Sequence, residues 1–347
     1  TFTFCTARPA VIVCPGGAYT SLSDREAAPP ALEFLNMGFQ SFILRYHVGA
    51  EARHKQPLLK DLAQAVLYLR AHAGALHIDV NKIAVLGFSA GAHLAASLGV
   101  HWNDPVITAV CDVTESSLLR PNAMILGYPV ITAYQFAHQG SIETVSADCS
   151  EPLDYWSLER CVTPQTPPTF LWYTMNDPCV PMESSLLFAQ ALHAANVPAE
   201  CHIFPDGPHG MTTCTQEVDT PSVHTRQWLI LCEMWLKELF GTNLSFCVYY
   251  FQRIDTNAVL HHFKMKMEPV LSPVLPTYPI TCPAVTASPA VTAVCVMKDL
   301  RRIQQNLIAV AVVPAGDNDR AAMAGVAVSV GFTGVAGNIG VAGQRPD

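Results

Sequence analysis

Up to about residue 240, short apolar segments alternate with longer segments that carry apolar side chains at helical spacing, and this alternation constrains the fold more than any other feature. The short segments are rich in β-branched and aromatic residues, which predicts buried strands. They cover residues 10–14, 39–46, 82–88, 122–128, 169–174 and 200–204. Amphipathic helices are predicted at 57–73, 185–196 and 223–240. Strands alternating with helices are typical of βαβ units, so we expect an α/β fold with a mostly parallel central sheet and helices on both faces.

After Phe240 the character of the chain changes. Residues 268–294 are dominated by Pro, Val, Thr and Ala, and residues 321–344 are almost wholly small, without the turn and helix signals of the first part. We therefore expect one folded catalytic domain at 1–241, followed by an irregular, low-complexity and poorly ordered extension at 242–347 that is not catalytic. The chain begins at Thr1 rather than at Met, so we expect a truncated N-terminus. A leader peptide before Thr1 is therefore an open alternative.

Composition excludes several functional classes. Half of the 347 residues are hydrophobic and 14% are charged, as in globular proteins. The formal net charge is −8 and the basic residues form no cluster, so nucleic acid is not an expected partner. No apolar run is long enough to cross a membrane, so no membrane association is expected.

The 12 cysteines are scattered and contain no Cys-x-x-Cys pair. This spacing argues against a metal site and against a disulfide framework, so we expect reduced thiols in a cytoplasmic protein. Cys14, Cys201 and Cys232 lie within apolar runs and are expected to be small buried side chains.

The segment GFSAG at 87–91 follows a predicted strand and precedes a helical stretch. A nucleophilic serine on a sharp strand-to-helix turn needs small neighbours, and Gly87 and Gly91 supply them around Ser89. The alternative is a glycine-rich turn with an incidental serine, and the motif alone does not separate the two.

A serine nucleophile needs a base and an acid, expected in loops after later strands in the order Ser, acid, His. Asp177 follows the strand at 169–174, and His209 follows the strand at 200–204. Separately, Asp177 could open an Asp-Pro turn and His209 could be a surface histidine, while Asp206 is a second acid on the same loop. Three candidates at three expected strand ends favour a Ser89–Asp177–His209 triad.

The same mechanism needs two N–H donors for an oxyanion. The backbone N–H of Ala90 is the first, and the second is expected from Gly17 or Ala18 in CPGGAY at 14–19, which follows the first strand. The alternative is a plain Pro-Gly turn. Among other histidines, His93 is expected to support packing. His47, His54 and His202 are weaker candidates, and none belongs to a metal cluster.

Several segments together resemble the α/β-hydrolase esterases of the BD-FAE type, the bifunctional acetyl-xylan and feruloyl esterases. They are CPGGAY, FILRYHV, LRAHAGALHIDVNKIAVLGFSAGAHLAASLG, GYPVIT, TPQTPPTFLWYTMNDPCVPMESSLLFAQAL and ECHIFPDGPHG, within residues 9–240. The resemblance implies a hydrolase sheet, a serine esterase mechanism without a cofactor, and a triad at Ser89, Asp177 and His209. Ala18 and Ala92 stand where the family usually has glycine, which could narrow the oxyanion loop at Ala18.

The expected function is therefore hydrolysis of a small acyl ester, with acetyl on a xylan-type carbohydrate as the expected substrate. Two enzymatic alternatives, an arylformamidase and a small peptidase, would use the same triad, and a non-catalytic binding protein with a hydrolase fold is a third. A loop at 131–166 is expected near the site, where Tyr134, Phe136 and Trp156 form either an apolar wall or core packing. The expected partner is a small-molecule or oligosaccharide ester; the sequence does not indicate an oligomeric state.

Overall fold

The computed structural model describes residues 7–53, 55–147 and 151–241, and the backbone of three further strands at 292–296, 308–314 and 327–330. Six parallel strands form the sheet of the domain, in the order β6-β5-β4-β3-β1-β2. They are β1 (Arg8–Cys14), β2 (Gln40–Arg45), β3 (Ile78–Phe88), β4 (Ala123–Gly127), β5 (Thr169–Thr174) and β6 (Ala199–Phe204). The expected α/β fold with a parallel sheet is confirmed.

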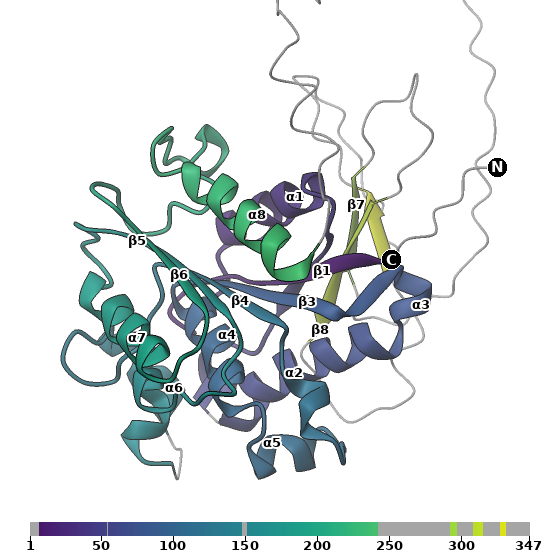
Figure 1. Ribbon diagram of the computed structural model, residues 1–347, viewed down its shortest axis with the longest axis horizontal. Helices are drawn as coiled ribbons and strands as arrows, with labels where there is room; N and C mark the ends of the chain where they lie inside the picture. The colour runs from purple at the N-terminus through teal and green to yellow at the C-terminus, as the bar shows by residue number, and fades with distance from the viewer. Residues whose placement is uncertain are drawn as a thin grey trace, which may run out of the picture.

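Helices cover both faces of this sheet (Figure 1). The α-helices are α1 (Ala28–Asn36), α2 (Lys55–Ala71), α3 (Ala73–Leu76), α4 (Ala90–His101), α5 (Pro105–Val110), α6 (Gln139–Ser146), α7 (Met182–Ala194) and α8 (Gln227–Phe240). Single turns of 3-10 helix are η1 (Asp24–Glu26), η2 (Gly49–Arg53), η3 (Ser116–Leu119), η4 (Leu153–Trp156), η5 (Leu158–Arg160) and η6 (Gln216–Val218).

Two apolar cores lie on the two faces, because successive side chains of a strand point in opposite directions. Ile12 faces the core that contains α2, α4 and α7, whereas its neighbour Val13 faces the core that contains α1 and α8. Both side chains are fully buried. The continuous apolar runs at the centre of the sheet thus reflect burial on both faces.

The strand register brings the functional loops to one edge. Cys14 at the end of β1 pairs with Gly87 of β3, and Phe88 pairs with Gly127 at the end of β4. Gly127 in turn pairs with Trp172 near the end of β5. The loops that follow β1, β3, β4 and β5 therefore start side by side at the carboxyl edge, where parallel α/β sheets bind their ligands.

The sequence prediction was wrong for β6, which is an edge strand and not a buried one. β6 pairs with β5 alone, and its alternate residues Ala199, Cys201 and Ile203, which share one face of this edge strand, are exposed. Cys201 is therefore not a buried small side chain, whereas Cys14 and Cys232 are buried as expected.

Element boundaries also differ from the prediction. β3 starts at Ile78 rather than at residue 82, because Ile78 pairs with Arg8 at the start of β1. Helix α7 starts at Met182, directly after Pro181, and α8 starts at Gln227. Residues 131–166, expected to be a loop, contain α6, η4 and η5.

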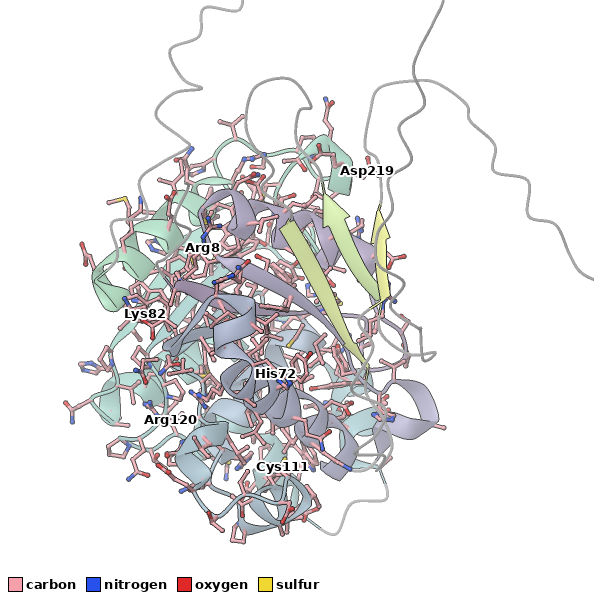
Figure 2. The ribbon with its side chains drawn as sticks, turned by 90° about the vertical axis from the view of Figure 1, so that its right-hand side faces the viewer. Arg8, His72, Lys82, Cys111, Arg120 and Asp219 are labelled. Atoms are coloured by element: carbon pink, nitrogen blue, oxygen red, sulfur yellow. The ribbon has the colours of Figure 1, made fainter. Side chains whose placement is uncertain are left out.

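Beyond residue 241, three strands continue the sheet past β2: β7 (Thr292–Val296), β8 (Ile308–Pro314) and β9 (Ala327–Val330). Strand β8 runs parallel to β2, β7 runs antiparallel to β8, and Figure 2 shows them in yellow at this edge. The rest of the predicted extension at 242–347 lies outside the described residues. None of the described helices is long and apolar enough to cross a membrane.

Candidate active site

Ser89 lies on a strained turn between β3 and α4. Its backbone has φ 53° and ψ −120°, outside the regions that residues with a side chain prefer, and α4 begins at the next residue. The Ser89 N–H donates to the Gly127 carbonyl at 3.1 Å, which fixes the turn to the end of β4. A strained backbone held by surrounding structure is typical of a nucleophile elbow.

The two predicted elbow glycines are required by close backbone approach. A Cβ on Gly87 would lie 2.3 Å from the Gly91 carbonyl oxygen. A Cβ on Gly91 would lie 2.1 Å from the Cys14 carbonyl oxygen. The turn can therefore form only because the serine has glycines two residues before and two residues after it.

A continuous hydrogen-bond chain connects the three predicted triad residues. His209 Nε2 lies 2.8 Å from Ser89 Oγ, and His209 Nδ1 lies 2.7 Å from Asp177 Oδ2. Because a carboxylate only accepts, Nδ1 carries the proton and Nε2 is free to accept the Ser89 hydroxyl proton. The structure brings these residues together from the ends of β3, β5 and β6, although 120 positions separate Ser89 from His209.

Asp177 is fixed on its other side by two backbone donors. Its Oδ1 accepts the N–H groups of Cys179 and Val180 at 2.8 and 3.0 Å, and its side chain is 1% exposed. The Asp-Pro turn and the acid role are thus compatible. Asp206, the other candidate acid, is exposed and accepts from the Asn176 amide at 3.1 Å.

The glycine-rich loop after β1 lies directly beside the nucleophile. A Cβ on Gly16 would lie 2.9 Å from the Ser89 Cβ. Gly17, Ala18 and Tyr19 all have positive φ, of 131°, 53° and 61°. Ala90, as the first residue of α4, has an N–H without an acceptor inside the helix. The loop thus reaches Ser89 at Gly16, and the donor roles of Ala90 and of Gly17 or Ala18 stay predictions.

Besides its bonds to Thr20, Ser21 and Ser23, four hydrogen bonds hold this loop, called here the oxyanion loop (residues 14–19). The Gly16 N–H donates to Glu26 Oε2 at 2.9 Å, and the Tyr46 hydroxyl donates to the Pro15 carbonyl. The Gly49 N–H donates to the Tyr19 carbonyl at 2.7 Å. The fourth bond joins the Tyr19 hydroxyl to His93 Nδ1 at 2.8 Å. Fixing of this kind is what preorganised oxyanion donors require.

His93 is more than the packing residue that the sequence predicted. It is fully buried, and its Nε2 lies 3.0 Å from the Trp156 carbonyl, so Nε2 carries the proton and Nδ1 accepts from Tyr19. Burial lowers the pKa of His93 to about 4, which keeps the ring neutral. The sequence could have indicated this role, because His93 follows Ser89 by four residues and residues at this spacing lie on one face of a helix.

Sequence analysis missed two further residues at the site, Glu26 and Tyr128. The Tyr128 hydroxyl donates to Glu26 Oε1 at 2.8 Å and accepts the Thr212 N–H at 3.2 Å. The Tyr128 ring meets the His209 ring edge-on, with centroids 4.8 Å apart. Tyr128 could have been found, because it follows β4 at the same sheet edge as the triad loops; Glu26 gives no local signal.

The three residues predicted to form either an apolar wall or core packing differ in burial. Trp156 is 1% exposed and stacks on His93, so the core alternative holds for it. Tyr134 is exposed, and its hydroxyl donates to Asp154 at 2.7 Å beneath the Arg160 guanidinium. Phe136 is partly buried.

The weaker histidine candidates have other partners. His47 Nδ1 lies 2.7 Å from Asp61, and His202 Nε2 lies 2.6 Å from Glu200. His54 lies outside the described residues. Within the part of the chain that the structure describes, no group of His, Cys, Asp and Glu side chains could hold a metal ion.

A parallel sheet with a serine on a strained strand-to-helix turn, bonded to a histidine and an aspartate from later strand ends, defines the α/β-hydrolase class. The BD-FAE family model matches residues 5–192, more than half of the chain, and the chain belongs to this family.

Two curated relatives are named as a xylanase and an acetylxylan esterase. The sequence is 38% identical to an endo-1,4-beta-xylanase B of Butyrivibrio fibrisolvens over 217 residues, 60% of this chain and 33% of the relative. It is 27% identical to an acetylxylan esterase of Xylanibacter ruminicola over 209 residues, 58% of this chain and 40% of the relative. The chain thus spans between a third and two fifths of the length of these relatives.

Solved structures share the fold. An acetyl ester-xyloside bifunctional hydrolase from Caldicellulosiruptor lactoaceticus matches with a TM-score of 0.60 at 38% identity, covering 69% of this chain and 86% of that structure. The carboxylesterase Cest-2923 of Lactobacillus plantarum WCFS1 matches with a TM-score of 0.60 at 28% identity, covering 68% and 88%.

Proposed function

We propose that this protein is a serine carboxylic-ester hydrolase that removes small acyl groups, above all acetyl, from carbohydrate esters of the xylan type. The observation that carries the proposal is the chain of hydrogen bonds from Ser89 through His209 to Asp177, at 2.8 and 2.7 Å, with Ser89 on a strained elbow. A serine in this arrangement has an adjacent base and an oriented acid, which is what activates a hydroxyl as a nucleophile.

In the first half of the reaction, Ser89 Oγ attacks the ester carbonyl while its proton passes to His209 Nε2. Asp177 holds the imidazole in the required tautomer and stabilises the imidazolium that forms. The tetrahedral intermediate then expels the carbohydrate oxygen, which takes the proton back from His209. An acyl group remains on Ser89.

The carbonyl oxygen becomes negatively charged in the intermediate and needs donors already in place. The N–H groups of Ala90 and of Gly17 or Ala18 supply them, and the N-terminal end of α4 adds a favourable dipole. One such donor contributes about 3 to 4 kcal/mol of transition-state stabilisation in comparable sites.

In the second half, water attacks the acyl carbon and gives its proton to His209. The same donors stabilise the second intermediate, Ser89 leaves with the proton from His209, and free acetate is released. The residues used are all on the chain, and the reaction as written requires no cofactor.

The substrate class rests on the relatives. Their names include acetylxylan esterase and acetyl ester-xyloside bifunctional hydrolase. These names support an acetylated xylo-oligosaccharide as the physiological type of substrate.

The test is acetate release from acetylated xylo-oligosaccharides by the full chain, beside p-nitrophenyl acetate, butyrate and hexanoate. Ser89→Ala is the matched control, because it removes only Oγ. We expect turnover by the wild type that falls with acyl length, and a loss of at least about 10³-fold in the variant.

Equal turnover by the wild type and Ser89→Ala would overturn the assignment as an enzyme and favour a binding protein. An N-formyl aromatic amine and a short peptide anilide belong in the same panel. Faster turnover of either than of the acetyl esters would replace the esterase assignment with an arylformamidase or a peptidase.

A further inference from the structure

Glu26 is a buried carboxylate to which the reaction just proposed gives no role. Its side chain is 4% exposed, and in the described part of the chain it takes part in no ion pair. One oxygen, Oε2, accepts the Gly16 N–H at 2.9 Å, and the other, Oε1, accepts the Tyr128 hydroxyl at 2.8 Å. Burying an ionised carboxylate is costly unless hydrogen bonds satisfy both oxygens, as they do here.

The two partners of Glu26 belong to the two halves of the site. Gly16 lies in the oxyanion loop, so close to the nucleophile that a Cβ on it would be 2.9 Å from Ser89 Cβ. Tyr128 packs edge-on against the His209 ring and accepts the N–H of Thr212, three residues after His209. Glu26 therefore connects the oxyanion loop to the segment that carries the histidine.

The neighbouring residue of η1 makes a parallel contact. Arg25 Nη1 donates to the Val218 carbonyl at 3.1 Å, and Arg25 Nη2 would lie 3.2 Å from a Cβ on Gly210, directly after His209. The single turn η1 is thus bonded to the 207–219 segment through one residue and to the oxyanion loop through the next.

We propose that Glu26 is a positioning residue, which holds the oxyanion loop and the His209 ring in register by accepting one hydrogen bond from Gly16 and one from Tyr128. The inference rests on the proposed ester hydrolysis, in which both groups must meet one tetrahedral centre. A misplacement of about 1 Å between such groups costs on the order of 10²-fold in rate.

Both partners donate to Glu26, and a carboxylate accepts both bonds with its two oxygens. The Gly16 N–H can only donate, and the pKa of Tyr128 is raised well above its usual value, by burial first and by Glu26 second, so its hydroxyl stays protonated. A carboxylate offers two acceptor oxygens, whereas a glutamine offers one oxygen and one NH₂ group. In Glu26→Gln the oxygen must face the Gly16 N–H, which can only donate, so the NH₂ group faces Tyr128 and the bond that the Tyr128 hydroxyl donates is lost at nearly constant volume.

The experiment compares Glu26→Gln, Tyr128→Phe and the double variant with wild type, using p-nitrophenyl acetate on the full chain. Glu33→Gln is the matched control. Glu33 lies in α1 and pairs with Arg226 at 2.6 Å, so the same substitution there removes the charge of an ion pair that includes neither Gly16, Tyr128 nor His209. Thermal melting is recorded for every variant.

We expect Glu26→Gln to lower kcat about 10- to 100-fold with KM within about threefold, and Glu33→Gln to leave both unchanged. Tyr128→Phe keeps the ring against His209 and loses only the hydroxyl, so it is expected to lower kcat in the same direction. Because both substitutions break the same bond, the double variant is expected to lose little more than the worse single variant.

The positioning role is overturned if kcat of Glu26→Gln and of Tyr128→Phe stays within twofold of Glu33→Gln, if the loss lies in KM alone, or if the two losses multiply. If Glu26→Gln melts below the assay temperature, Tyr128→Phe decides by the same criteria. If neither the wild type nor Glu33→Gln hydrolyses any ester, the proposed function is overturned. If both are active and Glu26→Gln is as active as they are, only the positioning role of Glu26 is overturned.

Discussion

The Tyr19 hydroxyl lies 2.8 Å from His93 Nδ1, and this bond joins the oxyanion loop to the helix that begins beside Ser89. His93 in turn binds the Trp156 carbonyl through Nε2 at 3.0 Å. One neutral, fully buried imidazole therefore connects the loop after β1, the nucleophile helix and the segment after β4. The oxyanion loop has positive φ at three successive residues, so these bonds hold a backbone that would otherwise relax.

Tyr19→Phe is expected to lower the free energy of unfolding by about 1–3 kcal/mol, because it removes the 2.8 Å donor to the buried Nδ1 of His93 and leaves the Ser97 hydroxyl, 3.4 Å away, in its place. It is also expected to lower kcat, since the loop that carries the oxyanion donors loses an anchor. Urea unfolding followed by tryptophan fluorescence measures the first effect, and p-nitrophenyl acetate turnover measures the second.

Tyr134→Phe is the control for this substitution. It removes a hydroxyl that also makes a 2.7 Å bond, but to Asp154 on the exposed surface, where water can replace the lost partner. A change within about 0.5 kcal/mol is expected. If the two variants lose the same free energy of unfolding, burial of the bond between Tyr19 and His93 contributes nothing to stability.

Acidification is expected to destabilise the protein through His93. Burial lowers its pKa from 6.5 to about 4 in the folded state. Between pH 6.5 and 4 the unfolded chain therefore binds a proton that the folded protein does not. The stability that the neutral ring contributes is complete above pH 6.5 and is lost as the pH falls toward 4, with a slope of up to about 1.4 kcal/mol per pH unit.

His93→Gln isolates this contribution, because glutamine keeps a donor and an acceptor but does not titrate. Asp61 acts in the opposite direction: burial raises its pKa to about 6, so the folded protein gains a proton there on acidification. That contribution is common to both proteins and cancels in their difference. Urea unfolding at intervals from pH 7.5 to 4 should give a difference between the two proteins that changes below pH 6.5; a constant difference contradicts the prediction.

Ser89→Gly is expected to be more stable than Ser89→Ala by about 1 kcal/mol, although both are inactive. The backbone at residue 89 has φ 53° and ψ −120°, which glycine adopts freely and alanine does not. The two variants lose the same hydroxyl, so their difference reports the strain of the elbow. Thermal melting of both proteins measures it, and an alanine variant at least as stable as the glycine variant would show that no strain is stored at this turn.

The triad could be predicted because each member is set by a local rule. Ser89, Asp177 and His209 all follow short apolar strands, and parallel strands bring their carboxyl ends to one edge. Gly87 and Gly91 were predictable for the same reason, as a sharp turn into a helix needs small neighbours. These expectations use only the order of elements along the chain.

The partners of those residues could not be predicted, because they depend on packing between distant segments. Glu26 and Tyr128 are 102 positions apart, and nothing in the polar sequence around Glu26 distinguishes it from a surface carboxylate. The prediction that Cys201 is buried was wrong for a related reason. A run of five residues does not indicate whether its strand lies at the centre or at the edge of a sheet.

Gly91→Ala is expected to cost about 2–3 kcal/mol of stability or more. The added Cβ would lie 2.1 Å from the Cys14 carbonyl oxygen and 2.4 Å from that of Pro15, and backbone atoms cannot move aside cheaply. Gly74→Ala in α3 is the matched control, since a Cβ there meets nothing within 4 Å. It should stabilise the helix by about 0.5–1 kcal/mol. Similar urea midpoints for the two variants would contradict the close packing of α4 on the oxyanion loop.

Asp177→Asn is expected to lower kcat on the order of 10⁴-fold with little effect on folding. Oδ1 accepts two backbone N–H groups, from Cys179 and Val180, so the single oxygen of asparagine must stay there. The NH₂ group then faces His209 Nδ1 and forces the ring proton onto Nε2, which can no longer accept the Ser89 proton. Asp206→Asn, on an exposed acid bonded to Asn176, should keep kcat within about twofold. The check is the kcat of both variants on p-nitrophenyl acetate. Equal losses of kcat in Asp177→Asn and Asp206→Asn would contradict the role assigned to Asp177.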